Sequence, residues 1–159
     1  RDEDCRTFGF GGDYMHCRSF YERYTGMREA LFLAGLPIDL KYSVLHDDSL
    51  SYEPEVLEEA IHNLPALPDC FIAANDTIAI NLLKALKTYK IAVPADTKVI
   101  GFDNIAESKQ ATPPLTSVNV NKTALGKRII NVLLERVNNP LHANQIIYIA
   151  SNVVISSST

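Results

Sequence analysis

Apolar residues recur along this chain at two spacings, and the two spacings alternate. Segments in which an apolar residue returns every three or four positions are predicted to be helices, because that spacing lines one helix face. These segments are 19–34, 54–64, a stretch that begins at Asp76 and includes Leu86, and 122–137. Short continuous apolar runs are predicted to be strands, and they occupy 7–12, 41–46, 70–75, 98–103, 115–120 and, as one or two strands, 146–156.

This alternation of strands and helices indicates an α/β fold. Successive strand ends lie about 30 residues apart, which is the size of a βαβ unit. Continuous apolar strands are typical of a parallel sheet that is buried on both faces. The sequence therefore predicts a three-layer α/β/α arrangement with a mostly parallel sheet and helices on both sides.

Small, polar or acidic residues stand where the predicted strands end. They are Gly11 and Gly12, His46 and Asp47, Asn75 and Asp76, and Asp103 and Asn104. A parallel sheet places these ends along one edge, where open α/β sheets bind their ligands. The Asn75 side chain both donates and accepts hydrogen bonds, whereas an ionised Asp103 only accepts them. This combination suits a polyhydroxylated ligand.

Structural roles compete with ligand binding at the same positions. Asp76 is most simply the N-cap of the helix that follows it, in preference to a ligand contact. If Asp76 is the cap, Asn75 is not needed there and remains a candidate for the ligand. Asp103 is equally compatible with ligand binding and with capping a short helix or closing an Asx-turn.

Composition and charge exclude several classes of function. The chain of 159 residues has a net charge of −4, so it lacks an overall basic field for nucleic acid or anionic lipid. No apolar run approaches the roughly 20 residues that a membrane-spanning helix needs, and we expect no membrane partner. The cysteines are Cys5, Cys17 and Cys70, an odd number without a C-x-x-C pair, which argues against a disulfide scaffold and is typical of the reducing cytoplasm.

Signatures of enzymes and metal sites fail when tested. Gly9 and Gly11 begin a dinucleotide-binding pattern, but Tyr14 stands where its third glycine is required. Neither a phosphate-binding G-x-x-x-x-G-K-[ST] loop nor a G-x-S-x-G nucleophile motif is present. The four histidines show no metal-ligand spacing. We therefore predict no catalytic residue, no metal and no cofactor.

Three motifs between residues 74 and 118 are more specific. They are Ala74-Asn75-Asp76, then Val93-Pro94 and Asp96 followed by Gly101-Phe102-Asp103-Asn104, and then Thr112-Pro113-Pro114-Leu115-Thr116-Ser117-Val118. Arg23 and Gly26 match a further helical motif of the same family. Together these residues resemble the effector-binding domain of the lactose-repressor/galactose-repressor family of bacterial transcription regulators, over nearly the whole chain.

The resemblance implies a type I periplasmic-binding-protein fold, here truncated. Residues 1–115 and 145–159 would form the C-terminal subdomain. Residues 116–144 would form a crossover strand and a helix that belong to an N-terminal subdomain otherwise missing, and the DNA-binding helix-turn-helix would also be absent. Because the chain begins at Arg1 rather than Met, we expect a piece of a longer protein. We expect the helix at 122–137 to dock against a second copy or to fold back onto its own sheet.

The resemblance also implies a binding site. Arg23, Asn75 and Asp103 match effector-contacting positions of the family, and Ser19 matches a further one. The family often stacks an aromatic ring on its ligand after the second strand, where Leu50 falls nearest and Tyr52 follows. The implied effector is a sugar or related polyol, or a nucleobase.

The function implied by the resemblance is effector sensing in a cytoplasmic transcriptional repressor that acts as a homodimer. Operator DNA would bind through the helix-turn-helix that this chain lacks. The alternative is a periplasmic sugar-binding protein of the same fold that serves a transporter. An α/β enzyme is a third class, which turnover of a sugar or sugar phosphate would reveal.

Overall fold

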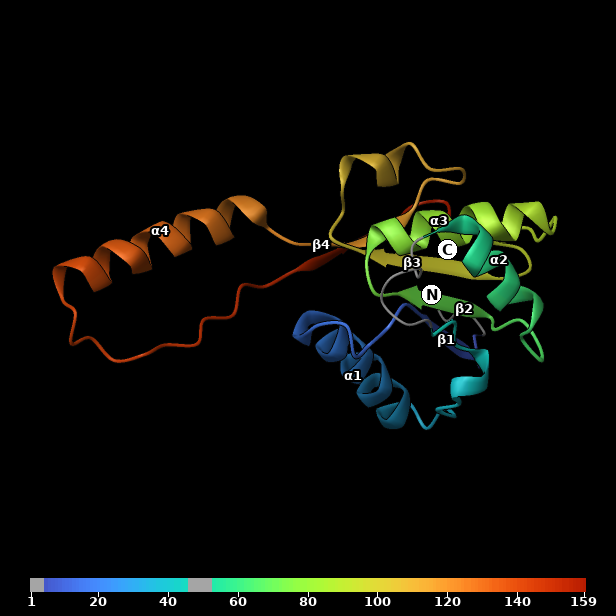
Figure 1. Cartoon of the computed structure of the whole chain (residues 1–159), viewed down its shortest axis with the longest axis horizontal. Coiled ribbons are helices and arrows are strands. Elements are labelled where there is room, and N and C mark those ends of the chain that lie inside the picture. Colours follow the sequence, from blue (N-terminus) through green and yellow to red (C-terminus); the bar gives the residue numbers. More distant parts are fainter. Residues whose placement is uncertain (1–4, 46–52) are drawn as a thin grey trace.

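The sheet has five strands in the order β1-β2-β3-β4-β5, as seen in a computed structural model that describes residues 5–45 and 53–159 (Figure 1). The strands are β1 (Phe8–Gly11), β2 (Cys70–Ala73), β3 (Lys98–Phe102), β4 (Thr116–Asn119) and β5 (Asn152–Val154). The first four are parallel and β5 is antiparallel to β4. The mostly parallel α/β fold predicted from the sequence is therefore confirmed.

Helices lie on both faces of this sheet. Helix α3 (Asp76–Thr88) covers one face so closely that a Cβ at Gly11 would lie 2.7 Å from the Leu82 side chain. Helix α2 (Pro54–His62) packs against α3. Helix α1 (Arg18–Leu33) lies on the opposite face (Figure 1). On that face the rings of Tyr24 and Phe10 meet with centroids 5.3 Å apart.

The two faces of the sheet are covered to different extents. Strand β3 alternates between half-buried and buried residues along its length. Val99 turns to α3 and is fully buried, whereas Ile100 and Phe102 turn to the α1 face and are half-buried. Their neighbours Ile72 and Val118 are also half-buried. The sequence predicted a sheet that is buried on both faces. This is correct for the face covered by α3, whereas α1 leaves part of the other face of the sheet open.

The strand predicted for 41–46 is wrong in its described part. A short 3-10 helix, η1 (Leu40–Tyr42), replaces its first half, and Val44 alone forms a parallel bridge with Gly11. The Ser43 hydroxyl accepts a hydrogen bond from the Phe10 amide at 3.0 Å, a position where a continuing strand would offer a backbone carbonyl. The Ser43 side chain therefore replaces one backbone acceptor of a regular parallel pairing. His46 and Asp47 lie outside the described residues.

The C-terminal part contains less strand than expected. The loop after β3 includes the 3-10 helix η2 (Ala106–Lys109). Helix α4 (Lys122–Asn138) matches the predicted helix at 122–137. Within 146–156 only β5 is a strand, and residues 146–151 run without regular structure.

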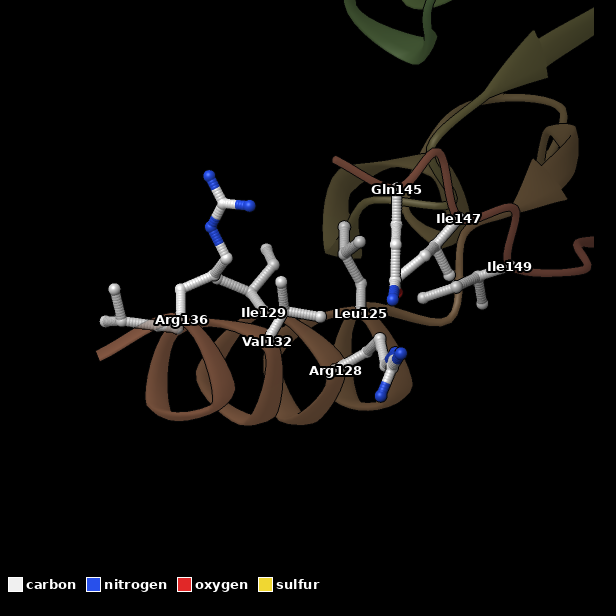
Figure 2. Close-up of a pocket in the computed structure, with 9 residues that line it drawn as sticks. Leu125, Arg128, Ile129, Val132, Arg136, Gln145, Ile147 and Ile149 are labelled. Carbon is white, nitrogen blue, oxygen red and sulfur yellow. The ribbon is translucent and has the colours of Figure 1, made fainter. Parts of the chain in front are cut away.

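Helix α4 projects away from the sheet, and the chain returns beside it before entering β5 (Figure 1). Of the two alternatives expected for this helix, docking against a second copy or folding back onto its own sheet, the second is therefore not observed. Leu125, Ile129 and Val132 instead turn towards Ile147 and Ile149 of the returning segment (Figure 2). The groove between the helix and this segment has a volume of about 370 Å³, and it is open to solvent.

Candidate functional site

An ion pair joins α1 to the carboxyl end of β3. The Arg23 guanidinium donates from Nη2 to Oδ1 of Asp103 at 3.1 Å and from Nη1 to the Ala74 carbonyl at 2.6 Å. Its carbon lies 3.8 Å from the centroid of the Phe102 ring, a distance typical of a cation–π contact. Three contacts thus fix the arginine above the ends of β2 and β3.

The surroundings of Asp103 combine burial with charges of both signs. Burial raises the pKa of its carboxyl above the usual range, and the nearby Asp76 raises it further. The Arg23 and Lys122 cations act in the opposite direction on this pKa. The Asp103 side chain is 32% exposed, so the carboxylate is reachable by a ligand. It can accept hydrogen bonds from hydroxyl or N–H groups.

Lys122 is a neighbour of this site that the sequence did not reveal. Its ammonium donates to the Asp103 carbonyl at 2.8 Å and reaches the Asn104 carbonyl at 3.5 Å. The first turn of α4 is therefore tied to the loop that carries Asp103. A lone lysine after a strand forms no motif, so sequence reasoning did not find it.

Asn75, and not Asp76, is the N-cap of α3. The backbone of Asn75 is extended, and its Oδ1 accepts a hydrogen bond from the Ile78 amide at 2.9 Å. The predicted assignment of the cap to Asp76 is wrong, because Asp76 is already helical and its side chain is 1% exposed. The Asn75 oxygen is thus occupied. Its Nδ2 has no hydrogen-bond partner among the described residues and remains available as a donor.

This cap makes a testable distinction between the two ends of the Asn75 side chain. Asn75→Ala should lower stability by about 1 kcal/mol, whereas Asn75→Asp should retain the cap and much of that stability. Thermal unfolding of the two variants checks the difference. Equal melting temperatures for both variants, well below that of the wild type, would mean that the cap contributes nothing measurable.

Ser19 lies in the first turn of α1 and is exposed. Its hydroxyl is 3.1 Å from the Cys17 thiol, and this hydrogen bond lowers the pKa of that thiol. Ser19 and Arg23 line one groove of about 620 Å³, which runs over the open face of the sheet past Ile72, Ile100 and Val118. The groove is largely apolar, and the partner of Asp103, Arg23, is one of its lining residues.

The structure thus brings together three of the predicted site residues and a fourth nearby. Arg23 contacts Asp103 directly, and it binds the carbonyl of the residue that precedes Asn75. Ser19 shares the groove with Arg23. Leu50 and Tyr52 lie outside the described residues. Within residues 5–45 and 53–159, no group of three or more His, Cys, Asp or Glu side chains has a metal-binding arrangement.

Comparison with known sequences identifies relatives along the whole chain. The family described as "Periplasmic binding protein-like domain" matches residues 1–159. The HTH-type transcriptional repressor PurR of Actinobacillus pleuropneumoniae serotype 3 is 37% identical over 119 residues, which are 73% of this chain and 34% of that protein. The regulator GalR of Lacticaseibacillus casei is 30% identical over 165 residues, covering 95% of this chain and 47% of its own length. The chain therefore spans between about a third and a half of these relatives.

Solved structures show the same fold. A LacI-type transcriptional regulator from Bacillus cereus superposes with a TM-score of 0.85 at 27% identity, covering 98% of this chain and 55% of its own. A transcriptional regulator CelR in complex with cellobiose has a TM-score of 0.87 at 24% identity, with 98% and 47% coverage. Among the described residues, no helix is both long and apolar enough to cross a membrane. The chain belongs to the periplasmic binding protein-like domain family, in the form carried by the lactose-repressor/galactose-repressor transcription regulators.

Proposed function

We propose that this chain is the effector-sensing part of a transcriptional repressor, and that the effector binds at the edge where Arg23 meets Asp103. The ligand would be a sugar or related polyol, or a nucleobase. Arg23 would donate to it, Asp103 would accept from its hydroxyl or N–H groups, and the Nδ2 of Asn75 would add a donor. Ser19 would contact it from the first turn of α1.

The observation that carries this proposal is the partly exposed ion pair at the carboxyl ends of β2 and β3. Open α/β sheets bind ligands at this edge, where loops rather than strands meet the ligand. The arginine is held by two hydrogen bonds and an aromatic ring, so its guanidinium is oriented before any ligand arrives. Preorganisation of this kind lowers the entropic cost of binding.

The whole protein would bind operator DNA as a homodimer in the cytoplasm, through a helix-turn-helix outside this chain. A relative named as a transcriptional repressor and another named as a transcriptional regulator support this over the alternative, a periplasmic sugar-binding protein of a transporter. Both classes would bind a small ligand at the same edge. They differ in whether ligand binding changes affinity for DNA.

A thermal-shift screen of the full-length protein tests ligand binding. Cellobiose, galactose, a hexose phosphate and hypoxanthine represent the two chemical classes. A binder at about 100 times its dissociation constant should stabilise the protein by roughly 2.7 kcal/mol. Failure of both sugars and nucleobases to shift the melting temperature would argue against the proposed site.

The second test measures operator affinity with and without the compound found in that screen. A coupling free energy of about 1–3 kcal/mol would change DNA affinity roughly 5- to 150-fold. The measurement uses fluorescence anisotropy on promoter DNA that the full-length protein selects. Tight ligand binding together with unchanged DNA affinity would favour the transport protein.

A further inference from the structure

Asp76 is the one fully buried charged side chain among the described residues, with 1% of its surface exposed. Its Oδ1 accepts a hydrogen bond from the Ser117 hydroxyl at 2.6 Å. Its Oδ2 accepts from the Ile105 amide at 2.9 Å and from the Ser108 hydroxyl. All three donors are neutral, and all three lie beyond the end of β3 or on β4. A buried carboxylate needs such partners, because an unsatisfied one is costly.

The loop that these bonds hold is the one that carries Asp103. Asp103 and Asn104 have φ angles of +105° and +47°, a region that L-residues rarely adopt. The Asp103 amide donates to the Val118 carbonyl at 2.9 Å, and the Asn104 amide donates to the Ser117 hydroxyl at 3.0 Å. Ile105 donates to Asp76 itself. Two of three consecutive amides therefore depend on Asp76, one directly and one through Ser117.

Strand β3 makes room for this carboxylate. A Cβ at Gly101 would lie 2.1 Å from Oδ1 of Asp76, so only glycine fits opposite it. The Asp76 side chain thus passes from the start of α3, across β3, to Ser117 on β4. A helix cap would need none of this space, and Asn75 already provides the cap.

We propose that Asp76 is a positioning residue for the effector site: its carboxylate fixes the backbone of residues 103–105 so that the Asp103 side chain faces Arg23. The effect of Asp76 on effector binding rests on the proposed function, whereas its effect on the loop backbone does not. The strained backbone at Asp103 persists only where its surroundings hold it, and Asp76 supplies that hold. Asp76 also lies close enough to Asp103 for its charge to raise the pKa of the Asp103 carboxyl.

The test is Asp76→Asn in the full-length protein, with Asp69→Asn as a matched control. The Asp69 carboxylate also accepts three hydrogen bonds, from the amides of Arg6 and Thr7 and from the Thr7 hydroxyl. It lies at the amino ends of β1 and β2, away from the proposed site. Both changes should lower the melting temperature. Only Asp76→Asn should speed amide hydrogen exchange at residues 103–105, by more than tenfold, and lower the pKa of Asp103 in an NMR titration.

The affinity measurement uses whichever of cellobiose, galactose and hypoxanthine binds the wild type. Asp76→Asn should weaken that affinity more than tenfold, whereas Asp69→Asn should not. Faster exchange with unchanged affinity would overturn the positioning role. If none of the probes binds the wild type, the proposed function loses its support, and exchange and titration still decide whether Asp76 fixes the loop.

Two further variants keep the inference testable if Asp76→Asn does not fold. Ser117→Ala removes the bond to the Asn104 amide and should speed exchange at that residue. Ser108→Ala removes a hydroxyl that touches Asp76 without touching the loop amides, and should leave exchange at residues 103–105 close to that of the wild type. Equal exchange in these two variants would overturn the proposal.

Discussion

Asp103→Asn is expected to weaken effector affinity more than tenfold while leaving the melting temperature at pH 7 unchanged or higher. Loss of a charged hydrogen-bond partner costs about 1.5–3 kcal/mol of binding free energy, which corresponds to more than a tenfold change in affinity. Asparagine keeps an oxygen for Arg23. It also tolerates the positive φ at this position, which alanine would not, so the backbone is expected to be preserved.

The stability part of this result follows from the raised pKa of Asp103. Because folding raises this pKa above its ordinary value of 3.8, the folded state favours the protonated carboxyl. The stabilisation that the protonated Asp103 gives the folded state is fully present at a pH below the pKa of the unfolded chain. It is lost as the pH rises through the higher pKa of the folded state. At pH 7 the ionised carboxylate therefore carries a penalty that asparagine avoids. The difference between variant and wild type should shrink as the pH is lowered towards 3.8.

Calorimetric titration and thermal unfolding across this pH range measure both effects. Asp39→Asn is a suitable control, because Asp39 lies outside the site. Its carboxylate forms an exposed ion pair with Lys41, with Oδ2 and Nζ 2.8 Å apart. That change should alter neither affinity nor the pH dependence attributed to Asp103. Unchanged effector affinity in Asp103→Asn would remove this residue from the site.

Hydrophobic spacing was sufficient to locate most of the elements. Helix α1 was expected at 19–34 and occupies Arg18–Leu33, and β3 was expected at 98–103 and occupies Lys98–Phe102. These elements bury a regular stripe or run, so their local pattern and their final environment agree. The prediction for 41–46 failed because the conformation of this segment depends on hydrogen bonds to the distant strand β1, including one from the Phe10 amide to the Ser43 hydroxyl, and no local pattern encodes them.

The candidate residues Arg23 and Asp103 do lie in contact, but sequence reasoning did not give the hydrogen bonds that hold Asp76 behind them. Sequence reasoning assigned the cap to Asp76, because aspartate is a good cap and the helix begins there. Two of its three partners, Ser108 and Ser117, lie 32 and 41 positions later, and no local pattern links them to it. The Gly101 in the Gly-Phe-Asp-Asn motif was the one available signal, since a small residue there admits the buried carboxylate.

The 159-residue chain is expected to associate with itself through α4. Ile129, Ile130, Leu133, Leu134 and Val137 are between 54% and 67% exposed, so apolar residues lie on more than one side of this helix. A helix of this kind is normally buried. Burial of each such side chain is worth about 1.5–3 kcal/mol, and a group of exposed apolar side chains on one helix marks an interaction surface. Sedimentation velocity at micromolar concentration should therefore detect a dimer or larger species.

Charged substitutions on α4 identify the surface responsible. The double variant Ile130→Glu with Leu134→Glu avoids the residues that line the groove beside the returning segment, so α4 should keep its contacts within the chain. It should sediment as a monomer. Phe32→Glu with Leu33→Glu is the matched control, because these residues are 75% and 81% exposed at the end of α1, and this variant should associate like the wild type. A strictly monomeric wild-type chain in which the α4 amides exchange freely with deuterium would show that the helix frays in solution instead of burying its apolar faces.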